Sequence, residues 1–432
     1  MLSSNRHLLS QLSPFRKISV LLAALGALAA IVVTTSASAT ISRAHSDRGY
    51  GCSDPYPSTR NPANPLMLNP APPPGDPLQG ARFFVDGPRH GSAAGAIAHV
   101  LGIDTGTPIG HPLPSFADGE SWATFSQEVA RRLPNQSPSV QHKIQELEKI
   151  ASEPEPQRIS AYSEGGSPKG IYGQSVKLFC HNFTADPGAI PIINTYFLPG
   201  TLHGCPTMGE INRYRPKFKA QIDSIARATG NRPVVWLLEL DYLGSSSCIA
   251  HHGSLGGWES LMRFEVKKLA TLPHAVTYIE AGYSDSNHPR YTARALNRSD
   301  IRQTEGFYTN DTHEQWTINE IHWGDKVSRM THGAHFVVST SQNGQGPKLN
   351  RHPTTQGVED LCNAPGRGLG PRPNTDPGFA HVDAFLWAIV PGNSSGHCNG
   401  GPSGGTFWAA RAILLADRAQ AKLGPTFAAN RY

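Results

Sequence analysis

The sequence predicts an α/β protein whose sheet is mainly parallel. From Asp76 to about Lys422, short apolar, β-branched runs alternate with stretches whose apolar residues recur at helical spacing. No internal repeat is visible, and sustained alternation of this kind is typical of strand-helix units. At this length a closed barrel is favoured over an open sheet. In either case we expect the functional site where the strands end, at their carboxyl side.

The expected elements follow one another along the chain. Buried strands are predicted over residues 82 to 85, 190 to 196, 234 to 238, 275 to 279, 335 to 339 and 384 to 387. Helices are predicted over residues 121 to 133, 139 to 152, 211 to 229, 258 to 269 and 406 to 422.

Composition and charge exclude two classes of protein. Hydrophobic residues make up 38% of the chain, which is enough for a large core and rules out disorder of the whole. The net charge of +5 falls to +2 without Arg6, Arg16 and Lys17, and no basic run follows. We therefore expect no nucleic-acid partner.

The amino end resembles a secretory signal peptide. Basic residues precede an apolar stretch from Val20 to Val33, and an Ala-x-Ala pattern ends at Ala39. The apolar stretch is shorter than the ~20 residues that span a bilayer, which disfavours a membrane anchor. We expect residues 1 to 39 to be removed and the mature protein to be secreted, extracellular and free of membrane contact. Residues 40 to 75 are proline-rich and predict a linker, which leaves residues 76 to 432 for one catalytic-type domain.

The six cysteines fit the oxidising compartment to which a signal peptide leads. An even number suggests three disulfides, and fifteen connectivities are possible. Zinc is the competing interpretation, but no Cys-x-x-Cys pair occurs. We expect no metal site and no cofactor.

Two carboxylates follow the apolar run at residues 234 to 238. Because side chains alternate along a strand, Glu239 and Asp241 are expected to share one face. Two carboxylates in a barrel mouth suit acid and base chemistry at a glycosidic bond. A hydrogen-bonded structural pair is the alternative.

At this point the sequence resembles family 6 of the glycoside hydrolases, the cellobiohydrolases and endoglucanases. The run at residues 234 to 243 is similar to the family strand that ends in Glu-Pro-Asp-Ser-Leu, with Leu240 in place of the proline. Further similar segments occur in order: residues 77 to 86, 150 to 154, 278 to 282, 306 to 310, 339 to 344 and 362 to 370. The resemblance covers nearly the whole chain from Asp76. It implies a distorted, incompletely closed parallel α/β barrel.

The resemblance also implies roles for particular residues. It pairs Cys205 with Cys248 and Cys362 with Cys398, and leaves Cys52 and Cys180 to each other or free. It implies that Asp241 supports the proton donor from nearby. Glu239, from the same acidic run, is the second catalytic candidate. Asn310 is expected to bond a sugar hydroxyl, and Glu280 is the second candidate for substrate binding.

The chain departs from the family pattern at the two positions where the resemblance implies an acid and a base. Gly204 stands at the acid position, with His203 the nearest titratable group, and Ser395 stands at the base position. The family's neighbouring Lys and Glu have become Ile389 and Asn393. Two functions are therefore expected: a β-1,4-glucanase that inverts configuration, or a catalytically impaired protein that binds glycan or cell-wall polysaccharide on the same fold.

Overall fold

The structure is a computed structural model that describes residues 63–87, 92–103, 122–202, 204–347 and 362–424. The predicted signal peptide and His203 lie outside the described residues. Among the described helices, none combines the length and the apolar character needed to cross a membrane.

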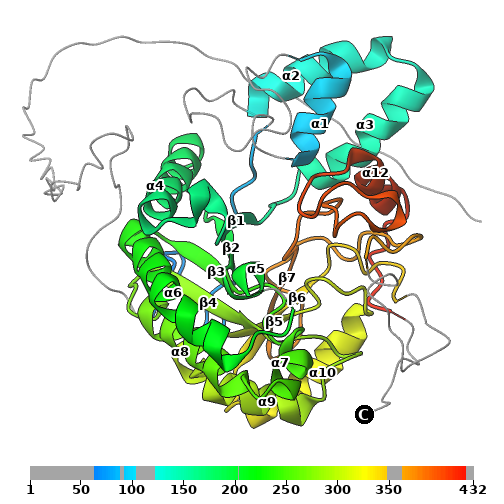
Figure 1. The fold of residues 1–432 in the computed structure, drawn as a ribbon. Coiled ribbons are helices and arrows are strands. Elements are labelled where there is room, and N and C mark those ends of the chain that lie inside the picture. The colour runs from blue at the N-terminus through cyan, green and yellow to red at the C-terminus, as the bar shows by residue number, and fades with distance from the viewer. Residues whose placement is uncertain (1–62, 88–91, 104–121, 203, 348–361, 425–432) are drawn as a thin grey trace, which may run out of the picture. The chain divides into compact units, whose positions relative to one another are not determined.

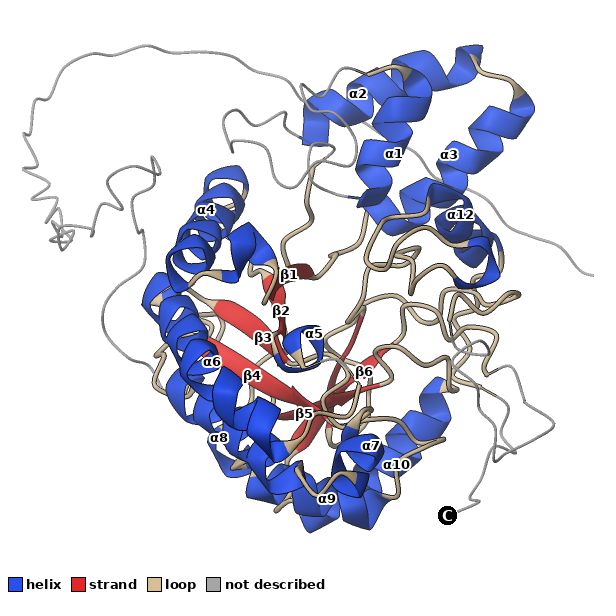
Figure 2. Ribbon diagram, viewed as in Figure 1, coloured by secondary structure: helices blue, strands red, loops and turns tan. Residues whose placement is uncertain are grey.

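In the described part of the chain, seven strands form one sheet, and all are parallel and paired in chain order (Figure 2). The strands are β1 (Gln157–Ser160), β2 (Ile192–Tyr196), β3 (Val234–Leu238), β4 (Ala275–Glu280), β5 (Gly306–Thr309), β6 (His335–Ser339) and β7 (Val382–Leu386). The sheet curls, but among the described residues β1 pairs only with β2, and β7 only with β6. The barrel is therefore incompletely closed, as the family resemblance implied, and the preference for a closed barrel was wrong.

Side chains of β3 show why the strands are buried on both faces. Trp236, with the residues two positions before and after it, packs in the core that includes the outer helices. Val235 and Leu237 point the other way and pack in a second core inside the barrel. All five residues of the strand are buried. Continuous apolar runs are what a parallel sheet covered on both faces requires.

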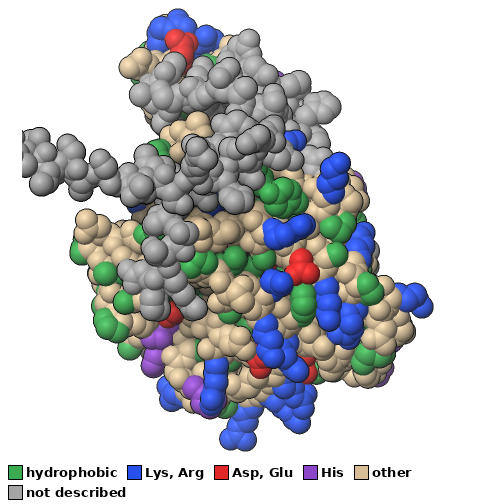
Figure 3. Space-filling model, turned by 90° about the vertical axis from the view of Figure 1, so that its left-hand side faces the viewer, with side chains coloured by type: hydrophobic (Ala, Val, Ile, Leu, Met, Phe, Trp, Pro, Cys, Tyr) green, Lys and Arg blue, Asp and Glu red, His purple; other side chains and the backbone are tan. Residues whose placement is uncertain are grey.

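Helices cover the outer face of the sheet (Figure 1). They are α4 (Pro168–Ala185), α6 (Met208–Thr229), α8 (Leu255–Leu269), α9 (Pro289–Arg298) and α10 (Thr317–Met330), and each packs against the next. Helix α6 begins with a capping box, in which Thr207 and Glu210 bond each other's backbone N–H groups. Lys and Arg side chains are the commonest charged groups on the face shown in Figure 3.

A second group of helices packs beside the carboxyl-terminal part of the sheet. It consists of α1 (Ser92–Leu101), α2 (Trp122–Arg132), α3 (Pro138–Ala151) and α12 (Ala409–Asp417). These helices share a core with Leu369 and with Trp387, which directly follows β7. Two shorter helices, α5 (Leu198–Thr201) and α7 (Ser246–His251), follow β2 and β3.

Most of the predicted elements are present with shifted ends. The predicted strand at residues 82 to 85 is the exception, because it forms only a parallel bridge between Phe83 and Ile190. Strands β1 and β5 were not predicted, since each has four residues and neither presents a β-branched run. Part of the predicted linker packs on the barrel: Leu66 is buried among barrel residues, and the carbonyl of Pro65 is bonded to His274.

Candidate active site

A cavity of about 640 Å³ opens where the strands end at their carboxyl side. Its wall comes from β1, from the end of β2 and from the segments that follow β1, β3, β5, β6 and β7. The lining residues are Arg158, Ser160, Tyr162, Tyr196, Leu240, Asp241, Thr312, His313, Cys362, Ile389, Asn393, Ser394, Ser395, Gly404 and Gly405. The cavity therefore lies where the fold class predicts a site.

The backbone leaves the regular strand conformation at this edge. Glu239, Asp241 and Asn310 have φ values of 57°, 62° and 66°, in the left-handed region that side-chain-bearing residues rarely adopt. Strand alternation therefore stops at Leu238. The prediction that Glu239 and Asp241 share one face was wrong for this reason: Asp241 lines the cavity and Glu239 does not.

Asp241 is the carboxylate among the described lining residues. Its Oδ1 accepts hydrogen bonds from the Tyr283 hydroxyl at 3.0 Å and from Thr312 Oγ1 at 2.9 Å. Its backbone N–H donates to Asp311 Oδ2 at 3.2 Å. Two hydroxyl groups thus hold one carboxylate oxygen, which fixes the side chain at the cavity wall.

A second carboxyl group lies directly behind Asp241. Asp311 is fully buried. Burial, followed by the charge of Asp241, raises the pKa of Asp311 to about 7. Asp311 therefore keeps its proton up to about neutral pH, directly behind Asp241.

Glu280 adds a third carboxyl group to this region but does not line the cavity. It is fully buried, and its Oε2 accepts the backbone N–H groups of Leu243 and Gly244. Burial, followed by the charges of Asp311 and Asp241, raises its pKa well above the ordinary value. These contacts tie the segment after β4 to the segment after β3.

Glu239 lies on the other side of the same turn. Its Oε2 accepts the backbone N–H groups of Phe197 and Leu198 at 2.8 and 2.7 Å, which holds the start of α5. Burial raises its pKa to about 7, and the neighbouring buried Glu265 has a pKa raised by burial and by the charge of Glu239.

The predicted sugar-binding residue Asn310 is engaged with the backbone. Its Nδ2 donates to the carbonyls of Gln315 and Ser339, and its Oδ1 accepts the N–H of Gln315. Both of its amide N–H groups are therefore used within the protein. This arrangement shapes the segment that carries Asp311, Thr312 and His313.

Of the positions at which the chain departs from the family pattern, some line the cavity and one does not. Ile389, Asn393 and Ser395 all line it. Gly204 does not line it, and an added Cβ there would meet no atom within 4 Å.

Several residues of the site were missed in the sequence. Arg158 projects from β1 into the wall, with its guanidinium 5.6 Å from the centre of the Tyr196 ring. His313 lies in the wall and bonds Asp285, and its ring stacks on that of Tyr283. Their position in the sequence could have indicated residues 311 to 313, because they directly follow Asn310 at the end of a strand, where a site was expected.

Two disulfides hold the loops at this end of the barrel. Cys205 is bonded to Cys248, which joins the loop after β2 to α7. Cys362, which lines the cavity, is bonded to Cys398. Both pairings implied by the family resemblance are confirmed. Cys180 is also disulfide-bonded, and Cys52 lies outside the described residues.

Among the residues that the structure describes, two groups of side chains could hold a metal ion, and neither lines the cavity. One consists of His142, Glu146 and Asp417, and the other of Glu305, His335 and Asp383. The second lies at the amino ends of β5, β6 and β7, the opposite edge from Asp241.

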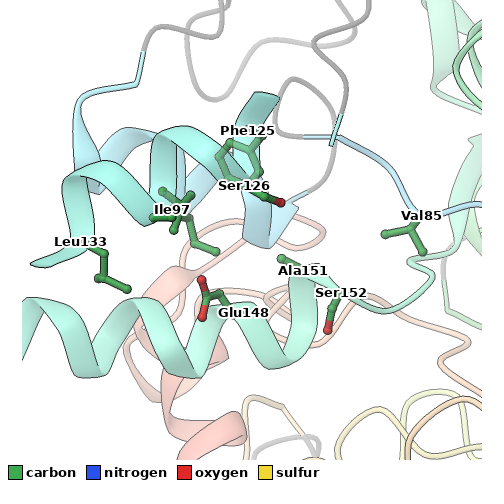
Figure 4. A pocket seen from close by; sticks show the side chains of 10 residues that line it. Val85, Ile97, Phe125, Ser126, Leu133, Glu148, Ala151 and Ser152 are labelled. Atoms are coloured by element: carbon green, nitrogen blue, oxygen red, sulfur yellow. The ribbon is translucent and has the colours of Figure 1, made fainter. Parts of the chain in front are cut away.

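A second cavity of about 640 Å³ lies among α1, α2 and α3 (Figure 4). Its lining is mostly apolar, with Ile97, Phe125 and Leu133 among the residues that face it. Glu148 is the titratable group among its described lining residues, and burial raises its pKa. Acid and base chemistry needs at least two polar groups that converge, so the cavity at Asp241 is the candidate active site.

Several buried carboxyl groups predict that the protein is more stable in mild acid than in mild base. Burial raises the pKa of Glu155, Glu239, Glu314 and Glu320 to about 7 in each case. The folded state therefore holds protons that the unfolded state releases near pH 4 to 5, and this stabilisation is lost as the pH rises through about 7. Thermal unfolding should show a midpoint at least a few degrees lower at pH 8 than at pH 5. An equal or higher midpoint at pH 8 would contradict these assignments.

An incomplete parallel barrel with a carboxylate in a cavity at the carboxyl ends of its strands defines an α/β-barrel protein with a candidate active site. The model of the glycosyl hydrolases family 6 matches residues 125–419, and the chain belongs to this family.

Individual relatives agree with the family assignment. Endoglucanase A of Cellulomonas fimi is 29% identical over 274 residues, which cover 63% of this chain and 56% of that protein. Endoglucanase A of Thermobispora bispora is 30% identical over 236 residues, which cover 54% and 49%. The chain thus spans about half the length of these relatives.

Solved structures are similar as well. The endoglucanase Cel6 from Mycobacterium tuberculosis, solved with a methyl-cellobiosyl-thio-cellobioside, matches with a TM-score of 0.59 and 26% identity. The match covers 79% of this chain and 99% of that one. Endoglucanase CEL6B from Humicola insolens matches in fold, with a TM-score of 0.56 and 14% identity.

Proposed function

We propose that this protein is a secreted glycoside hydrolase that cleaves β-1,4-linked glucan with inversion, and that Asp241 is its proton donor. The observation that carries the proposal is the position of Asp241 in the cavity wall, backed by the buried carboxyl group of Asp311. Asp311 keeps its proton up to about pH 7 and so leaves a proton source directly behind Asp241.

The substrate class is supported by the shape and chemistry of the wall and by the relatives. Tyr162 and Tyr196 offer aromatic surface, and Ser160 and Arg158 offer polar groups for sugar hydroxyls. Relatives named as endoglucanases, and a similar structure that holds a cello-oligosaccharide analogue, favour a cellulose-type substrate. The predicted signal peptide and the disulfides support secretion.

A second candidate is a protein that binds the same polysaccharide without cleaving it. The observation that favours it is the presence of Ile389, Asn393 and Ser395 in the cavity wall, where the family resemblance implied charged groups. It would leave Asp241 as a binding group.

A panel of soluble β-1,3-, β-1,4- and mixed-linkage glucans separates the two candidates. We expect new reducing ends from the β-1,4-linked substrates, at a rate that Asp241→Asn lowers sharply. Retardation of β-1,4-glucan in affinity gels without new reducing ends would instead support the binding protein.

A further inference from the structure

A histidine and a carboxylate form a pair at the cavity wall. His313 lines the cavity, and its Nδ1 lies 2.9 Å from Asp285 Oδ1. His313 Nε2 has no hydrogen-bond partner among the described residues, and this atom is not fully buried. Nε2 therefore faces the cavity. Asp285 fixes the orientation of the ring and holds the single N–H proton of the neutral imidazole on Nδ1, which leaves Nε2 as the proton acceptor.

The imidazole is held at a set position relative to Asp241. Its ring stacks on Tyr283 with a centroid separation of 3.6 Å and an interplanar angle of 11°. The hydroxyl of that same tyrosine donates to Asp241 Oδ1. One tyrosine side chain thus contacts both groups, with its ring face against His313 and its hydroxyl against Asp241.

Inversion requires an acid and a base on opposite faces of the sugar. A water molecule must fit between the sugar and the group that takes its proton, on the face opposite the proton donor. In the described cavity wall, Ser395 stands at the position expected for the base, and its hydroxyl is far too weakly basic for this task. The imidazole of His313 is the group in the described wall, other than Asp241, that can accept a proton near neutral pH.

We propose that His313, oriented by Asp285, is the general base that activates the attacking water, an inference that rests on the proposed hydrolase function. The water oxygen forms a bond to the anomeric carbon as its proton passes to His313 Nε2. The carboxyl group of Asp241 gives its proton to the glycosidic oxygen as the bond between that oxygen and the anomeric carbon breaks. The new hemiacetal has inverted configuration, and the imidazolium returns its proton to solvent while the carboxylate is protonated again.

The surroundings of His313 make this role compatible with turnover near neutral pH. Burial lowers the pKa of His313, but the hydrogen bond and charge of Asp285, with smaller contributions from Glu314 and Asp311, raise it above its ordinary value. Asp311, which lies behind Asp241, keeps its proton up to about pH 7. A neutral imidazole and a protonated Asp311 therefore coexist over a narrow range around neutrality.

Two substrates distinguish a base from an acid. A β-1,4-glucan needs a proton on its leaving oxygen, whereas 2,4-dinitrophenyl β-cellotrioside has a leaving group that needs none. We expect His313→Ala to lower turnover of both by roughly 10²- to 10⁴-fold. Added azide, a nucleophile with no proton to lose, should restore release of dinitrophenol and give an α-glycosyl azide. The control is His381→Ala, which removes a matched pair, His381 with Asp325 at 3.1 Å, before the start of β7; it should turn over as wild type does.

Asp285→Asn tests whether Asp285 positions His313, and it leaves the imidazole in place. It removes the charge that raises the pKa of His313, so the acidic limb of the kcat/KM profile should move to lower pH. Because the imidazole remains, the loss of turnover should be smaller than in His313→Ala.

Several outcomes would overturn the proposal. They are wild-type turnover in His313→Ala, loss on β-glucan with normal release of dinitrophenol, or an unchanged acidic limb in Asp285→Asn. Absence of turnover in the wild-type protein on both substrates would instead refute the proposed function. An active wild type with an unaffected His313→Ala variant would refute only the inference about His313.

Discussion

Asp241→Asn is expected to lower turnover of β-1,4-glucan by roughly 10²- to 10⁴-fold, the usual contribution of a positioned proton donor. The amide is nearly the same size and can keep the bonds from Tyr283 and Thr312, so folding should be preserved. It cannot donate a carboxyl proton. On 2,4-dinitrophenyl β-cellotrioside the same variant should lose much less, because that leaving group needs no proton.

A matched control is Asp376→Asn, which changes an exposed aspartate outside the described cavity wall. Its turnover on both substrates should equal that of wild type. Equal losses on both substrates in Asp241→Asn would show that Asp241 does not act as the donor. Unchanged activity would place the chemistry elsewhere.

Replacing Cys205 and Cys248 together by serine should lower the free energy of unfolding by roughly 3 to 4 kcal/mol. The bridge closes a sequence separation of 43 residues, and the chain-entropy account assigns this cost to the freer unfolded chain. Urea unfolding of the oxidised proteins, followed by tryptophan fluorescence, measures the difference. The variant should be less stable than wild type in oxidising buffer and equal to it in reductant.

The control for the bridge is Cys205→Ser alone, which should be destabilised as much as the double variant. Equal stability of wild type and the double variant under oxidising conditions would show that the bridge does not constrain the unfolded chain.

The parallel sheet could be predicted because its physical cause is visible in the sequence. Runs such as the one at β3 (Val234–Leu238) are apolar throughout, as strands covered on both faces must be. Strands β1 and β5 were not predicted, because a strand of four residues is too short to show a clear apolar pattern. Closure of the barrel depends on contacts between β1 and β7, which are far apart in the chain. No local sequence pattern therefore indicates whether the barrel closes.

The candidate site could be predicted in place but not in detail. The carboxyl-end rule and the acidic run after β3 led to Asp241, which lines the cavity. The different orientations of Glu239 and Asp241 could not be predicted from the alternation of side chains along a strand, because both residues adopt positive φ. The contacts of Asp241 with Asp311 and Tyr283 join segments that follow three different strands. Such contacts exist only once the strand ends are brought together.

The anomeric configuration of the first product tests the central claim most directly. Proton NMR spectra recorded within the first minutes of cellotetraose or soluble β-1,4-glucan hydrolysis separate the α and β forms before they interconvert. Direct displacement by water, with Asp241 as donor, predicts that the α-anomer appears first and the β-anomer grows in later by mutarotation. Initial accumulation of the β-anomer would contradict the account, because it would require a covalent intermediate and a nucleophile in place of the base.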